Sequence, residues 1–314
     1  MADKNKPFDI AGRTVKPGSR VVVEFPLARL PAEASPQMLP CLVAHGKTPG
    51  PTVFVSAAIH GDEINGTGVI RRLADDFSVA EMSGTVLMVP VVNHFGFALE
   101  SRYLPDRRDL NRCFPGSKRG SLGSRIARIF MDEIVERCDA GVDLHSGSNH
   151  RTNTPHIRAN LDDPKARALA QAFGTPWMMH AKLRPGSLRE AGGRKGVPIL
   201  TFEGGESHRF DRTVIAAAVD GVKGVLAHLS GTAQPENSRE IRKSVWLRAK
   251  RSGMFWSEVE PGDEVTKGAV VGRITDVLGR VDIPVHAPAP GVVIGLNLHP
   301  PVHQGDALLN LGLL

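Results

Sequence analysis

The residues of this sequence that are best suited to chemistry stand at the end of an apolar stretch. Residues 53–59 contain one polar side chain, and His60 and Glu63 follow in the turn before a predicted helix. An imidazole and a carboxylate three residues apart can converge on one metal ion. Alone, the pair is a weak signal, because His60 could be an ordinary turn residue and Glu63 a favourable charge at a helix N-terminus.

Three other apolar stretches end in a similar way. Residues 84–93 end on Asn93, residues 140–146 reach His145, and residues 197–203 end on Glu203. If these strands are parallel, their carboxyl ends meet at the edge of the sheet where open α/β folds bind ligands. The joint presence of His60, His145 and Glu203 at such ends favours a metal site over isolated turn residues.

The elements that must position these residues alternate between buried strands and amphipathic helices, a pattern typical of the α/β class. Helices are predicted at 65–77, 124–138, 163–173 and 212–229. Extended segments are predicted at 21–30, 38–44, 53–59, 84–93, 140–146, 154–160, 177–183 and 197–203. The first two are joined by a proline-containing turn, which suits the edge of the sheet. Asp143, two residues before His145, is a candidate for the carboxylate that orients this imidazole.

Cationic side chains are concentrated in the long loop 94–122 and in the helix after it. Much of the net charge of +6 comes from Arg102, Arg107, Arg108, Arg112, Lys118, Arg119, Arg125 and Arg128. This excess favours an anionic ligand, although a solvated basic face is the commoner origin of such runs. Nucleic acid is disfavoured, because the segment has few aromatic side chains for bases to stack on. Within the loop, Asn111 and Arg112 offer an amide and a guanidinium suited to a carboxylate, or they belong to a simple self-capped turn.

Length and composition are those of a folded protein with a sizeable core. The chain has 314 residues, of which 41% are hydrophobic and 23% charged. The polar segment 1–10 lacks the apolar core of a signal peptide, and no later stretch has about 18 apolar residues in a row. We therefore expect a cytoplasmic protein that does not bind a membrane. Cys41, Cys113 and Cys138 are too sparse for a disulfide framework or a cysteine zinc site.

Residues 231–238 have the composition of a linker, and beyond them the sequence pattern changes to short strands and turns. This predicts a catalytic domain at 1–230 and a small all-β domain at 239–314. In the second domain, residues 259–268 and 296–305 form a weak repeat that resembles the biotinyl/lipoyl-type barrel sandwich. Such carrier domains have an attachment lysine in a hairpin that here reads Gly279-Arg280-Val281-Asp282. We expect a structural or partner-binding module without a swinging cofactor.

Four motifs in order resemble those of the succinylglutamate desuccinylase/aspartoacylase family, which is related to the zinc carboxypeptidases. They are His60-Gly61-Asp62-Glu63, Asp109-Leu110-Asn111-Arg112, Asp143-Leu144-His145 and Glu203, within residues 45–210. The resemblance implies a zinc-carboxypeptidase-like mixed sheet flanked by helices, with one Zn²⁺ per chain bound by His60, Glu63 and His145. It also implies that Asn111 and Arg112 hold a substrate carboxylate and that Glu203 is the general base.

The resemblance further implies that Arg102 is the arginine that polarises the scissile carbonyl. The spacing from Arg102 to Asn111 is longer than in the aspartoacylase pattern. Arg107 and Arg108 are therefore alternatives for this role.

Three protein ligands leave zinc an open position for water, whose pKa falls toward about 7, and zinc also polarises a carbonyl. A glutamate can move the proton and an arginine can stabilise the oxyanion, so these parts suit hydrolysis of an amide in a small anionic molecule. The leading hypothesis is a zinc-dependent N-acyl amino acid deacylase. A zinc carboxypeptidase acting on small peptides and a non-catalytic carboxylate-binding protein are the alternatives. The acyl group, the amino acid and the oligomeric state, including a homo-oligomer, stay open.

Overall fold

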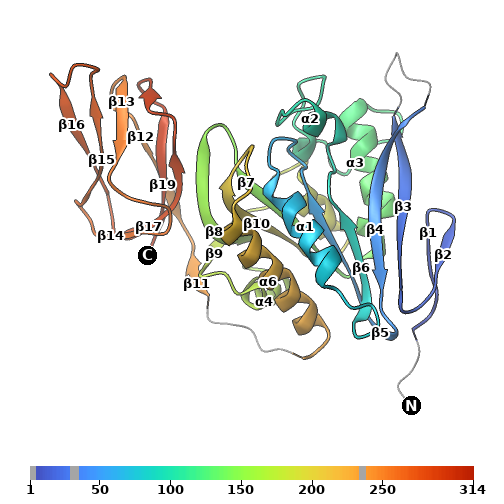
Figure 1. The fold of residues 1–314 in the computed structure, drawn as a ribbon. Coiled ribbons are helices and arrows are strands. Elements are labelled where there is room, and N and C mark those ends of the chain that lie inside the picture. The colour runs from blue at the N-terminus through green and yellow to red at the C-terminus, as the bar shows by residue number, and fades with distance from the viewer. Residues whose placement is uncertain (1–4, 29–34, 233–237) are drawn as a thin grey trace.

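A long mixed β-sheet runs through the computed structural model, which describes residues 5–28, 35–232 and 238–314. Its parallel centre consists, in spatial order, of β6 (Ser83–Val89), β5 (Thr48–Ala57), β7 (Ala140–Gly147) and β10 (Ile199–Glu206). Antiparallel strands extend it, with β4 (Gln37–His45) and then β3 (Ser19–Ala28) beside β6, and β8 (Arg151–Ala159) beside β10. The predicted α/β class with a mixed sheet is confirmed, and the carboxyl ends of the parallel strands lie at one edge of the sheet (Figure 1).

Helices cover both faces of this sheet (Figure 1). On one face lie α1 (Asn65–Asp76), α4 (Pro164–Phe173) and α6 (Arg212–Leu229), and on the other lie α3 (Leu122–Glu133) and α5 (Leu188–Arg194). Successive residues of β5 enter different cores, since Phe54 packs in the core with Phe130 of α3, whereas Val55 packs in the core with Val69 of α1. Strand β5 is thus buried on both faces, as the apolar pattern predicts.

Some boundaries differ from the predicted ones. The helix predicted at 124–138 begins at Leu122, because Ser121 caps it by accepting a hydrogen bond from the Ser124 N–H (3.3 Å), and it divides before η2 (Val135–Arg137). The strand predicted at 84–93 ends at Val89, and the loop predicted at 94–122 contains α2 (His94–Ala98) and η1 (Leu110–Arg112). No pattern predicted α5, because its seven residues include two glycines.

The N-terminal part agrees with an edge position. The predicted strands 21–30 and 38–44 correspond to β3 and β4, and much of the turn expected between them, up to residue 34, lies outside the described residues. A small hairpin of β1 (Phe8–Ile10) and β2 (Arg13–Val15) precedes them. Among the residues that the structure describes, no helix has the length and apolar character needed to cross a membrane.

The C-terminal part of the chain is all β, as predicted. Its strands are β11 (Arg239–Ile241), β12 (Ser244–Arg248), β13 (Gly253–Ser257), β14 (Glu264–Val265), β15 (Val270–Thr275), β16 (Asp282–His286), β17 (Gly291–Asn297), β18 (Pro301–Val302) and β19 (Ala307–Leu313). Strands β16, β15, β13 and β18 form a separate antiparallel sheet, and a third hydrophobic core that includes Phe255, Val271 and Leu308 lies in this part of the chain.

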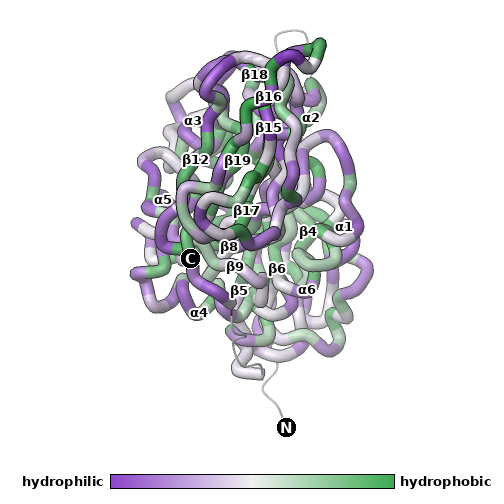
Figure 2. The backbone as a smooth tube through the Cα atoms, turned by 90° about the vertical axis from the view of Figure 1, so that its left-hand side faces the viewer, coloured by the Kyte–Doolittle hydropathy of each residue, from purple (hydrophilic) through white to green (hydrophobic). Residues whose placement is uncertain are grey.

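The remaining C-terminal strands continue the large sheet. Residues 295–297 of β17 pair antiparallel with residues 151–153 of β8, and β19 and β12 follow in order. Strand β11 pairs with β9 (Trp177–His180), which itself lies beside β8. The C-terminal strands lie at one end of the molecule and come to the front in Figure 2. The division at 1–230 and 239–314 stays a prediction, and most of the predicted linker, residues 233–237, lies outside the described residues.

Candidate active site

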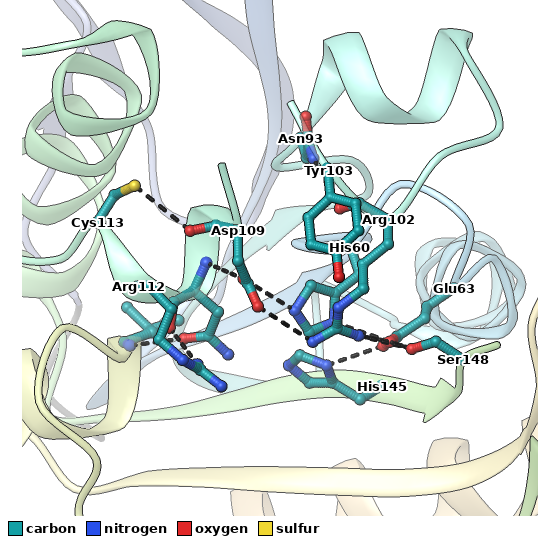
Figure 3. Close-up of polar contacts among 12 residues, drawn as sticks. His60, Glu63, Asn93, Arg102, Tyr103, Asp109, Arg112, Cys113, His145 and Ser148 are labelled. Carbon is teal, nitrogen blue, oxygen red and sulfur yellow. Dashed lines mark hydrogen bonds and ion pairs between the residues drawn. The ribbon is translucent and has the colours of Figure 1, made fainter. Parts of the chain in front are cut away.

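His60, Glu63 and His145 converge at the carboxyl edge of the parallel strands. Their potential ligand atoms all lie within 4.8 Å of one another, and the three residues are buried, with 4%, 2% and 5% of their surface exposed. The Nδ1 atom of His60 lies 2.8 Å from Oε1 of Glu63, and Nδ1 of His145 lies 2.9 Å from Oε2 (Figure 3). Two imidazoles and one carboxylate are a donor set that suits zinc, so these residues could hold a metal ion.

A tight turn brings His60 and Glu63 together. The Glu63 N–H donates a hydrogen bond to the His60 carbonyl (3.1 Å), which closes the turn between β5 and α1. Gly61 is required here, because a Cβ at this position would lie 2.0 Å from the Gly96 carbonyl carbon of α2. The hydrogen bond within the turn and the close packing of α2 against Gly61 therefore hold the turn in place without a ligand.

Each imidazole is held by a second carboxylate at its other ring nitrogen. Nε2 of His145 lies 2.7 Å from Asp143, whose other oxygen accepts a hydrogen bond from the Ser56 hydroxyl (2.8 Å). Nε2 of His60 lies 3.2 Å from Asp109. Such partners fix the ring orientation and tautomer of a metal-binding histidine. The contact expected for Asp143 is present, whereas the one from Asp109 was not expected, although the residue opens the Asp109-Leu110-Asn111-Arg112 motif.

The charged forms of the two histidines and of the neighbouring carboxylates stabilise one another. Burial alone would lower the pKa of His60 and His145, but the adjacent carboxylates Glu63, Asp109 and Asp143 raise both pKa values. Burial likewise favours a raised pKa for Glu63, yet the two histidines hold it well below its usual value. The Glu63 carboxylate is therefore ionised and ready to bind a cation.

Arg102 lies directly beside the cluster. One terminal nitrogen is 3.1 Å from Oε1 of Glu63 and 2.6 Å from Oγ of Ser148, and the other is 3.2 Å from Asp109 (Figure 3). The alternatives Arg107 and Arg108 are exposed and do not line the cavities at the cluster. Of the three arginines considered for the carbonyl, only Arg102 is placed at the site.

Asn111 and Arg112 lie in η1, which Asp109 caps by accepting a hydrogen bond from the Asn111 N–H (2.8 Å). The Asn111 side-chain oxygen accepts a hydrogen bond from the Leu188 N–H (2.9 Å), so the amide also anchors the start of α5. Arg112 has no acidic partner within 4.0 Å among the described residues. Burial, together with Arg184 and Arg102, lowers its pKa. One terminal nitrogen of its guanidinium donates a hydrogen bond to the Asn111 carbonyl, and the guanidinium lines both cavities at the site.

We call His60, Glu63 and His145 the metal-type cluster. Glu203 is on β10, next to this cluster but outside it. Its partner in register on the parallel strand β7 is His145. The Asn153 amide donates a hydrogen bond to one carboxylate oxygen (3.0 Å), and Arg158 lies 3.5 Å from the other. With these contacts, the carboxylate lines two cavities.

Two adjoining cavities of about 540 and 360 Å³ meet at His60, His145 and Glu203. The larger is lined by six cationic side chains, namely Arg102, Arg112, Arg158, Lys182, Arg184 and Arg189. The smaller is bounded by Trp246, Ile294 and Asn310 from the C-terminal strands. A further cavity, of about 790 Å³, lies elsewhere, beside Cys138 and His228, and contains none of the candidate site residues.

Comparisons with known proteins agree with this geometry. Residues 49–229 match the sequence model described as the succinylglutamate desuccinylase/aspartoacylase catalytic domain. The chain is 29% identical over 277 residues to N-alpha-acetyl-L-2,4-diaminobutyric acid deacetylase of Halomonas elongata, covering 82% of this chain and 81% of that protein.

Solved structures are similar over nearly the whole chain. The product-bound ectoine utilization protein EutE (DoeB) from Ruegeria pomeroyi has 25% identity and a TM-score of 0.84, with 98% of both chains covered. A succinylglutamate desuccinylase/aspartoacylase from Rhodobacter sphaeroides has 27% identity and a TM-score of 0.81, with 93% of this chain and 94% of that one covered. The similarity therefore includes the C-terminal strands as well as the matched catalytic segment.

Proposed function

The chain belongs to the succinylglutamate desuccinylase/aspartoacylase family, and we propose that it is a zinc-dependent hydrolase that removes the acyl group from a small N-acyl amino acid or a related anionic amide. The observation that carries this proposal is the convergence of His60, Glu63 and His145 within 4.8 Å, at cavities that Glu203 also lines. The deacetylase activity in the name of the Halomonas elongata relative supports the reaction type.

We assign one zinc ion per chain to His60, Glu63 and His145. Bound there, zinc would lower the pKa of a water molecule and polarise the carbonyl of the substrate. The ionised Glu63 supplies one negative charge, and Asp143 and Asp109 hold the imidazoles with Nδ1 toward that carboxylate. The donor set is thus arranged by residues outside it, as is usual for metal-binding histidines.

In this proposal Glu203 is the general base. Its position beside His145 in the sheet lets it accept the proton of the attacking water and transfer it to the leaving nitrogen. The Asn153 amide donates to one of its oxygens and Arg158 lies 3.5 Å from the other, so both groups orient the carboxylate, which lines both cavities.

In this proposal, arginines bind or stabilise the negatively charged groups of the substrate. Arg102 would stabilise the charge that develops on the carbonyl oxygen, and Arg112, with Asn111, would hold a carboxylate. Arg189 has no acidic partner within 4.0 Å among the described residues, and burial followed by the neighbouring Arg158 lowers its pKa to about 10. Because several guanidinium groups of this cavity lack a countercharge, an anionic substrate is favoured over a cationic one.

Hydrolysis assays test the proposal. The zinc-loaded chain should release acetate or succinate from N-acetyl or N-succinyl amino acids and should act poorly on dipeptides. Release from dipeptides alone would replace the deacylase with a carboxypeptidase. If neither class reacted and inductively coupled plasma mass spectrometry found no zinc after zinc was supplied, a non-catalytic carboxylate-binding protein would be the better description.

We also place the protein in the cytoplasm, and its three free cysteines are consistent with a reducing compartment.

A further inference from the structure

The hydroxyl of Ser148 connects the metal-type cluster to Arg102. Its O–H donates a hydrogen bond to Oε1 of Glu63 (2.7 Å), and its oxygen accepts one from Arg102 (2.6 Å). Two residues earlier, the Ser146 N–H donates to the other oxygen of Glu63 (3.2 Å). One oxygen of the buried carboxylate is therefore held by Ser148, in the turn between β7 and β8 (Figure 3), and the other by Ser146, near the end of β7.

This turn, residues 148–150, has an unusual backbone. Asn149 and His150 both have positive φ angles, 55° and 60°, although neither is glycine. The left-handed region is uncommon for residues other than glycine, although asparagine and histidine are enriched there, and contacts around the turn help to hold two such residues in succession. The contacts of the turn should therefore show what determines the position of Ser148.

The C-terminal strands supply these contacts. The Leu298 N–H donates a hydrogen bond to the His150 carbonyl (2.7 Å), and the His150 ring stacks on His299 with the ring centroids 5.0 Å apart. Directly after the turn, residues 151–153 of β8 pair with residues 295–297 of β17. From the other side, the Ser207 N–H, which follows β10, donates to the Gly147 carbonyl (2.8 Å).

We propose that Ser148 is a positioning residue that aligns Glu63 for the metal and Arg102 for the substrate, and that the C-terminal β region, through Leu298 and His299, holds Ser148 in place. The part of the inference that concerns Arg102 rests on the proposed function. The part that concerns metal binding depends only on Glu63, because the hydrogen bond from Ser148 restricts rotation of this carboxylate. Partners of this kind contribute about 10- to 100-fold to metal affinity or activity.

The test compares zinc affinity and kinetics in the full-length chain. Zinc dissociation constants are measured by competition with a chromophoric chelator, and kcat and KM are measured with the best N-acyl amino acid. Ser148→Ala removes the hydroxyl and should weaken zinc binding by about 10- to 100-fold. It should lower kcat with little change in KM, because Arg112 is untouched. Ser148→Thr retains a hydroxyl and should restore most of both properties.

The C-terminal contact is tested with a matched pair of histidines. His299→Ala removes the ring that stacks on His150 and should weaken zinc binding in the same direction as Ser148→Ala, by a smaller factor. His303→Ala removes an exposed histidine of the same region whose side chain has no contact with the turn, and it should bind zinc like the parent. Thermal unfolding of the metal-free variants shows whether each one is folded.

The outcomes separate this inference from the proposed function. Parental zinc affinity and kcat in Ser148→Ala would overturn the positioning role, as would an equal loss in Ser148→Thr. A His299→Ala chain that matches His303→Ala would overturn the part assigned to the C-terminal region. A parent chain that binds zinc tightly but hydrolyses no N-acyl amino acid would overturn the proposed function alone, since the Ser148 series would still be measured through zinc affinity.

Discussion

Glu203 and His145 occupy paired positions on the neighbouring parallel strands β10 and β7. Paired residues of adjacent strands point to the same face of a sheet, so the carboxylate and the imidazole emerge side by side. Their separation is set by the hydrogen bonding of the two backbones, and it does not depend on a loop. The proposed base and the proposed metal ligand are therefore held rigidly relative to each other.

The first prediction concerns this carboxylate. Glu203→Gln keeps the shape of the side chain and removes the proton acceptor, so kcat should fall by about 10²-fold or more while zinc content and KM stay near those of the parent. Steady-state kinetics and metal analysis measure the three quantities. Glu206→Gln, three residues further along the chain, loses only a surface ion pair with Arg209 and serves as the control. Normal turnover in the Glu203 variant would remove the proposed base.

The second prediction concerns the ligand set. His60→Ala or His145→Ala removes one of the three proposed protein ligands, so zinc and activity should be lost together. Plasma mass spectrometry after dialysis measures the zinc, and His228→Ala, in the last turn of α6, is the control. Bound metal also stabilises a fold, so melting curves must be compared in the metal-free state. Full zinc occupancy in either site variant would show that the ligand set is wrong.

The third prediction concerns the anion anchor. If Arg112 holds the substrate carboxylate equally in the ground and transition states, Arg112→Ala should chiefly raise KM. The loss should be largest for substrates that bear the carboxylate and small for the matching carboxamides. Arg107→Ala, in the same loop but away from the cavities, is the control. A variant that distinguishes carboxylate from carboxamide as well as the parent does would move the anchor to another arginine.

The fourth prediction concerns protons. The pKa values of His60 and His145 are raised in the metal-free chain, so at a given pH these imidazoles are more fully protonated than a free histidine, and zinc must displace the extra protons. Glu63, with a lowered pKa, is already ionised and releases none. Zinc affinity should therefore increase as pH rises through the raised histidine pKa values and decrease below them. Titration calorimetry near pH 7 in buffers of different ionisation enthalpy measures the protons released. An enthalpy that is independent of the buffer would contradict this expectation.

The metal-type cluster could be predicted from the sequence because its members follow apolar strands. Once β5, β7 and β10 are parallel, the ends that carry His60, His145 and Glu203 must lie at one edge. The contacts of Asp109 with His60 and of Ser148 with Glu63 could not be predicted in this way, since both partners lie in turns whose path depends on tertiary packing.

The arrangement of the C-terminal strands was equally beyond sequence patterns. Alternating apolar residues predict that β17 is a strand, but they do not indicate which edge it joins. The pairing of residues 295–297 with residues 151–153 depends on the three-dimensional course of the whole catalytic segment. For this reason the sequence predicts a small all-β region after residue 238 but does not predict that the large sheet continues into it.

This continuity has a consequence for how the protein is made. Residues 151–153 of β8 leave the ribosome long before their partners in β17, so this length of strand edge stays unpaired until β17 has been synthesised. A chain interrupted after α6 would carry His60, Glu63, His145 and Glu203 but lack the segment that contacts the 148–150 turn. A segment that is synthesised after these four residues thus completes their surroundings.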